Sequence, residues 1–121
     1  MYEESYLKED YFYQKNRTEM CVESVDVVTS YVNDQQNLKV AVSVLSLCGE
    51  PVRHGNVDLV INSPNGSKFS LSKSTDSNGV ALFELCGVER GRWEAVVFGV
   101  NHPEYHMSKA HCNQRWTITY V

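Results

Sequence analysis

Residues Ser74 to Cys86 read STDSNGVALFELC, and this stretch changes character at its middle. The first half is crowded with side-chain oxygens and ends at Gly79, whereas the second half alternates in the manner of a β-strand. Calcium requires several converging oxygens, and the EF-hand pattern places acidic residues at regular steps. Asp76 is the only carboxylate before the glycine. The pattern therefore favours a turn over a metal-binding loop.

The turn reading assigns a role to each half of the stretch. Asp76 and Asn78 are typical turn residues, and Gly79 is free to adopt a positive φ. Side chains at every second position of the following strand point to one face. We expect that face to enter the core through Ala81, Phe83 and Leu85.

The same alternation recurs along the chain, and turn residues separate the alternating segments. The segments lie at about residues 22–32, 37–47, 56–62, 67–73, 79–86, 92–100 and 114–121. Pro64-Asn65-Gly66-Ser67 contains the Asn-Gly pair typical of a type I′ hairpin turn. Short strands at this spacing predict an all-β fold, a seven-stranded antiparallel Ig-like Greek-key sandwich. Trp93 is expected to fill its centre.

Length and charge limit the possible classes. The chain has 121 residues, enough for one domain. A net charge of -4 argues against nucleic-acid binding, which needs a clustered basic face. No window approaches the roughly 20 apolar residues of a membrane span. We predict a tyrosine-rich arm or linker at residues 1–20 and the sandwich at 21–121, and the arm either frays or docks through its aromatic residues.

Four widely spaced cysteines suit two disulfides in an oxidising compartment. Strand direction alternates in the expected sandwich, so the end of the second strand and the start of the last lie together. This favours a Cys48–Cys112 bridge and leaves Cys21–Cys86 by elimination. The alternative is four separate buried thiols, because cysteine also packs as a small hydrophobe.

The segment NHPEYHMSKAHC, residues 101–112, holds a possible set of metal ligands. His102, His106 and His111 fit no standard zinc spacing, and Pro103 argues against a helix. The alternative is a polar connection between the last two strands. His54 lies in another turn, which could be at the same end of the sandwich.

Catalytic motifs are not evident. There is no Gly-x-Ser-x-Gly elbow, and His111 and Cys112 are neighbours whose side chains point opposite ways on a strand. No phosphate-binding glycine loop occurs. We therefore expect a protein that is not an enzyme and that carries no cofactor.

One apolar stripe is expected to face solvent. If Trp93, Ala95 and Val97 point inward, the intervening residues point outward. That set is Val96, Phe98 and Val100. Such a stripe usually marks a contact, made with a partner or with a covering segment such as the tyrosine-rich arm.

Three pieces of the chain resemble bacterial-type Ig-like domains of adhesins and carboxypeptidase-regulatory-like sandwiches. They are LCGEPVRHGNVDLVI (residues 47–61), STDSNGVALFEL (residues 74–85) and GRWEAVVFGV (residues 91–100). The resemblance covers about residues 38–100, and the cysteines and the histidine-bearing segment depart from it. It implies a spacer, an adhesion module or an appendage to a secreted enzyme, although fold alone does not fix function.

The resulting expectation is a non-catalytic binding, adhesion or spacer module of a secreted or cell-surface protein. Its partner would be another protein or a neighbouring domain of the same chain, with no nucleic acid and no membrane span. One alternative is an accessory domain of a secreted hydrolase such as a peptidase. Another is a small metal-binding protein that uses His102, His106 and His111.

Overall fold

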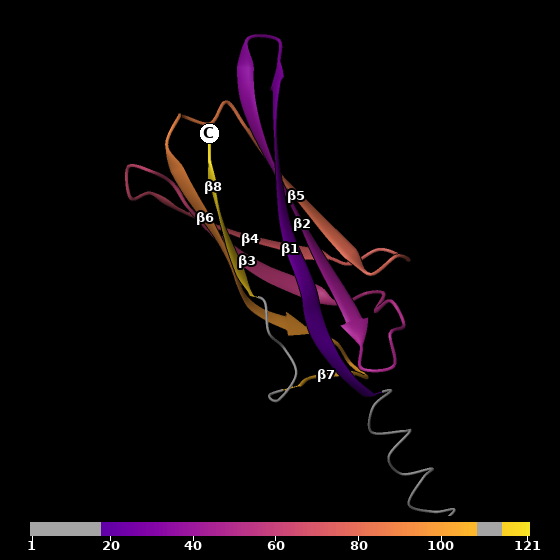
Figure 1. Cartoon of the computed structure of the whole chain (residues 1–121). Helices are drawn as coiled ribbons and strands as arrows, with labels where there is room; N and C mark the ends of the chain where they lie inside the picture. Colours follow the sequence, from indigo (N-terminus) through magenta and orange to yellow (C-terminus); the bar gives the residue numbers. More distant parts are fainter. Residues whose placement is uncertain (1–17, 109–114) are drawn as a thin grey trace, which may run out of the picture.

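The computed structural model describes residues 18–108 and 115–121, and these form two four-stranded sheets packed face to face (Figure 1). The strands are β1 (Glu19–Val32), β2 (Gln35–Ser46), β3 (Asn56–Asn62), β4 (Lys68–Ser74), β5 (Val80–Cys86), β6 (Arg92–Asn101), β7 (His106–Met107) and β8 (Trp116–Tyr120). Sheet A has the order β5-β2-β1-β7, and sheet B has the order β4-β3-β6-β8. The predicted all-β, two-sheet architecture is confirmed.

The predicted number of seven strands is wrong, because β7 is an eighth. It has two residues and pairs in parallel with Glu19 and Met20 of β1. A strand of two residues shows no alternation, so the sequence pattern predicts only a connection at this point. The first strand also begins at Glu19 rather than near residue 22. In the described residues, no helix is long and apolar enough to cross a membrane.

The core forms where the alternation predicts it. On β2, Val40, Val42 and Val44 are fully buried, and each is separated from the next by a half-buried residue. Ala81 and Phe83 lie beside them on β5 and are buried, as predicted, and Leu85 is partly buried against the same core. From sheet B, Trp93 is buried between the sheets, and its indole N–H donates to the backbone carbonyl of Glu89 at 2.9 Å.

The stretch from Ser74 to Cys86 begins with a turn that packs against the end of β2. Asp76 Oδ1 accepts hydrogen bonds from the backbone N–H groups of Asn78 (2.8 Å) and Val80 (3.0 Å), so its carboxylate closes a turn. Gly79 has φ +77° and its carbonyl accepts from the Val44 N–H at 2.8 Å. A Cβ on Gly79 would lie 2.6 Å from the Val44 carbonyl oxygen. The turn therefore docks closely on the end of β2.

A buried hydroxyl ties this turn to the loop after β2. Thr75 Oγ1 accepts from the Gly55 N–H at 2.8 Å and donates to the Val52 carbonyl at 2.6 Å. The backbone of Thr75 also bonds with Gly55 and His54. Two of the three segments that carry the resemblance to known sandwiches are therefore in direct contact.

The predicted type I′ turn at Pro64–Ser67 is wrong. Only Gly66 has positive φ there. The Gly66 N–H donates to the Ser63 carbonyl at 3.1 Å, so Pro64 and Asn65 are the central residues of the turn. Pro64 fixes the negative φ that an ordinary type I turn has at this position. Positive φ at two consecutive residues, which type I′ requires, occurs instead at Asn33 (52°) and Asp34 (62°). These two residues connect β1 and β2 at the tip of the long hairpin in Figure 1.

Candidate functional site

A β-bulge in β6 determines which residues face solvent. Leu59 of β3 pairs with Val97, but the preceding residue Asp58 pairs with Gly99, so Phe98 is an extra residue with no partner. Bulges of this kind reorient side chains. Phe98 is 67% exposed, whereas Val100 is turned inward and is only 5% exposed.

The prediction that Val100 faces outward is therefore wrong. Strict alternation holds only while the pairing is continuous, and one inserted residue reverses the parity beyond it. Val100 packs in the core, where its Cγ1 lies close to Gly55. Of the predicted stripe, Phe98 is exposed and Val96 is half-buried.

Strand β8 has its apolar residues on the solvent side. Thr119 and Thr117 pair with the buried residues Trp93 and Ala95, and paired residues in a sheet point to the same face. The threonines therefore face the core. The opposite face carries Trp116 (56% exposed) and Tyr120 (74% exposed), with half-buried Ile118 between them.

Together these residues form one apolar area on the outer face of sheet B, which we call the outer patch. It consists of Val60, Val96, Phe98, Trp116, Ile118 and Tyr120. Val96 joins its parts, because it pairs with Val60 on one side and with Trp116 on the other. Arg92 and Glu94 border it from β6.

The contribution of β8 was missed by sequence reasoning. The alternation of Trp116, Ile118 and Tyr120 shows an apolar side but does not say which way that side faces. The orientation comes from the pairing with β6, which the two hydrogen bonds between Gly91 and Val121 (2.9 and 3.1 Å) fix in register. A one-residue slip of β8 would reverse every side chain.

The structure describes two of the three predicted metal ligands, His102 and His106. His102 Nε2 lies 2.9 Å from the Arg53 carbonyl, and Nδ1 accepts from the backbone N–H of Glu104 at 2.9 Å. Both ring nitrogens therefore hold the loop together. His106 lies in β7, and His111 is outside the described residues. Within residues 18–108 and 115–121, no group of three potential metal ligands occurs. His54 does lie at this end, beside Arg53.

The predicted Cys21–Cys86 bridge is wrong. Cys21 pairs with Leu45 on β2, whereas Cys86 pairs with Asn37. These positions on one strand are separated by about 26 Å at the usual rise per residue. A disulfide needs Cα atoms within about 7 Å. The Cys48–Cys112 prediction involves Cys112, which lies outside the described residues, and the Cys48 side chain is exposed.

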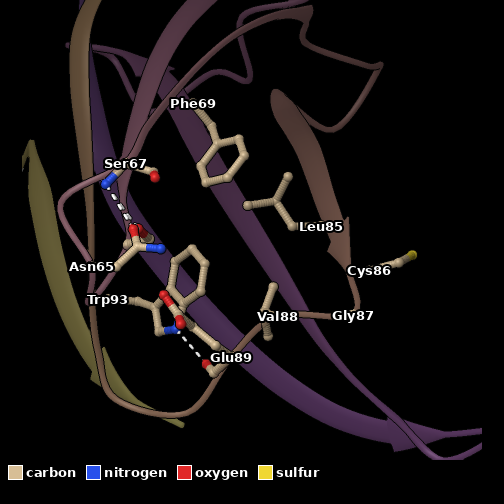
Figure 2. Close-up of a pocket in the computed structure, with 10 residues that line it drawn as sticks. Asn65, Ser67, Phe69, Leu85, Cys86, Gly87, Val88, Glu89 and Trp93 are labelled. Carbon is tan, nitrogen blue, oxygen red and sulfur yellow. Dashed lines mark hydrogen bonds between the residues drawn. The ribbon is translucent and has the colours of Figure 1, made fainter.

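A hollow lies between the β3–β4 turn and the β5–β6 connection (Figure 2). Its apolar wall includes Phe69 stacked near Trp93, with ring centroids 6.3 Å apart, and Leu85 and Val88. The volume is about 230 Å³. Small-molecule sites usually have about 300–1,000 Å³. This hollow is therefore a weaker candidate site than the outer patch.

Comparisons with known proteins do not add to this assignment. No protein-family model matches the chain. A search of curated proteins also found no significant match. The functional argument therefore rests on the outer patch.

Proposed function

We propose that this chain is a non-catalytic, Ig-like binding module that contacts a protein partner through the outer patch. The observation that carries the proposal is the exposure of three aromatic side chains, Phe98, Trp116 and Tyr120, on one sheet face. Aromatic residues are enriched and charged residues depleted at the centres of protein interfaces. A rim of polar residues is also typical, and Arg92 and Glu94 supply one here.

The arrangement of β8 strengthens this proposal. A strand that only completes a sandwich places its apolar residues inward, where each large side chain stabilises the fold by roughly 1.5–3 kcal/mol. Here the core receives Thr117 and Thr119, while Trp116 and Tyr120 face outward. A partner that covers these two aromatic rings would bury them, and their burial would then stabilise the complex rather than the fold of the chain.

The strand order supports an Ig-like sandwich. In Ig domains the second strand lies beside the fifth in one sheet, and the third strand lies beside the sixth in the other. The same neighbours occur here as β2–β5 and β3–β6. Strand β4 pairs with β3 rather than with β5, which gives four strands to sheet B.

The partner is a separate protein at the cell surface or a neighbouring domain of the same chain, such as the catalytic domain of a secreted hydrolase. The cysteine content and the family resemblance support the proposed extracellular location. Intact mass under reducing and non-reducing conditions tests it: the Cys48–Cys112 bridge predicts one disulfide, and four free thiols would contradict the location.

Photo-crosslinking tests the binding surface. A photoreactive phenylalanine analogue is placed at Phe98, and the matched control carries it at Leu82, which is 45% exposed on sheet A. The experiment is done in the cells that naturally make the protein. We expect the probe at position 98 to give one discrete crosslinked protein, and excess unlabelled chain should abolish this product. The probe at position 82 should give none. Equal crosslinking from both positions, or none from position 98, refutes the proposal.

A further inference from the structure

Strand β8 forms the free edge of sheet B in the described part of the chain (Figure 1). Gly91 and Val121 exchange both backbone hydrogen bonds. In an antiparallel ladder such pairs alternate with pairs that do not bond to each other. Thr119 and Thr117 therefore bond to β6, and the N–H and C=O groups of Trp116, Ile118 and Tyr120 point away from the sheet.

The other edge strands carry features that prevent pairing. In sheet B, β4 contains Lys68 and Lys73. In sheet A, β5 contains Glu84 and the edge strand β7 has only two residues. Beyond the two residues that pair with β7, β1 has Asp26 and a bulge at Glu23. Charged residues and bulges are the usual protection of a sheet edge. Strand β8 reads WTITY and has no charge, proline, glycine or bulge. Its residues are among those with the highest strand propensity.

We propose that β8 pairs with β8 of a second copy of this chain, in antiparallel orientation, with the two-fold axis at Ile118. The pairing joins the two copies of sheet B into one continuous sheet. It makes about six backbone hydrogen bonds, two for each of three residue pairs. This inference shares β8 with the proposed function, and it rests on that proposal in no other way.

The sequence of β8 is self-complementary about this axis. Ile118 meets Ile118 of the second copy, and Trp116 meets Tyr120 of the second copy at both ends. The backbone groups of all three residues point towards the second copy in the plane of the sheet. Their side chains lie on the outer face, beside those of the second copy. Aromatic pairs directly opposite each other in a sheet are favourable. No shift of register by two residues retains all three pairs, so the strand specifies one arrangement.

Charge variants at the axis give the sharpest test, because each places like charges opposite each other in a self-pair. We expect wild-type chain to show concentration-dependent dimerisation by analytical ultracentrifugation. Ile118→Lys and Ile118→Glu should each weaken it by at least about tenfold. An equimolar mixture of the two variants should associate again as a heterodimer. Ser70→Lys is the control, because it adds the same charge to β4, the other edge of sheet B.

Backbone chemistry gives a second test. Ile118→Pro removes an N–H that points out of the sheet and leaves the bonds to β6 intact, so the monomer should stay folded by circular dichroism. Dimerisation should be lost. Amide exchange should show protection of Trp116, Ile118 and Tyr120 only at concentrations where the dimer forms.

Four results would overturn the inference. They are a monomer at every concentration, a dimer that survives Ile118→Pro, the absence of a heterodimer in the mixture, and edge amides protected independently of concentration. The last result would mean that the chain covers its own edge. Phe98→Asp separates this inference from the proposed function: excess unlabelled Phe98→Asp chain should fail to compete away the partner crosslink from position 98, whereas the variant should dimerise like the wild type, because Phe98 lies on β6.

Discussion

Replacing Gly79 with alanine should destabilise the fold strongly, and the structure gives the magnitude. A non-glycine residue at φ +77° costs about 1–2 kcal/mol through its own backbone conformation. The new Cβ would also lie 2.6 Å from the Val44 carbonyl oxygen and 3.1 Å from the Val52 nitrogen. Both neighbours are backbone atoms, so relief requires the strands to separate.

That separation weakens two backbone hydrogen bonds, from Val44 to Gly79 (2.8 Å) and from Val52 to Val44 (3.0 Å). Each contributes about 1 kcal/mol. We expect a loss of about 3–4 kcal/mol in the free energy of unfolding. For a chain of this size the midpoint of thermal unfolding should fall by about 10–15 °C.

Gly66→Ala is the matched control. Gly66 has φ +90°, but a Cβ there meets nothing within 4 Å. The control should therefore show only the conformational cost of about 1–2 kcal/mol. Urea titration of both variants measures the difference. Equal losses would refute the reasoning, because the contact with Val44 would then cost nothing.

Further predictions concern the buried hydroxyl, the β6 bulge and the histidine loop. Thr75→Val removes the hydroxyl between two buried backbone groups and should cost about 2–4 kcal/mol in urea unfolding, whereas a change below 1 kcal/mol would show that these groups find other partners. Val100→Ala should cost about 2 kcal/mol and Phe98→Ala less than about 0.5 kcal/mol, and the reverse order would contradict the bulge. His102→Ala should accelerate amide exchange at Glu104, since that N–H loses its acceptor, while equilibrium dialysis against zinc should give the same result for variant and wild type.

The sequence was sufficient for features that depend on local pattern. Alternation located Val40 and Phe83 in the core, and turn chemistry identified Asp76 and Gly79 correctly. These predictions succeeded because each depends on residues within a few positions of one another. The alternation that defines the buried side of a strand and the turn residues beside that strand lie in the same short segment of sequence.

The sequence was insufficient where pairing across strands decides the outcome. The unpaired position of Phe98, and hence the burial of Val100, results from the match between β3 and β6. The orientation of β8 results from its register with β6. The Cys21–Cys86 prediction failed because elimination ignored the length of β2. Strand pairing and register depend on two segments at once and cannot be read from either one alone, so the outer patch was predicted only in part.

The strand order has a consequence for how this chain acquires its fold. Sheet A takes β1, β2, β5 and β7 from the chain, while sheet B takes β3, β4, β6 and β8, so the chain passes repeatedly between the two layers. Sheet A is not complete until residue 107 has been synthesised, and sheet B is not complete until residue 120. Contacts this distant in sequence slow folding to the millisecond-to-second range. Neither half of the chain encloses a core of its own, so we expect all strands to unfold together as one cooperative unit.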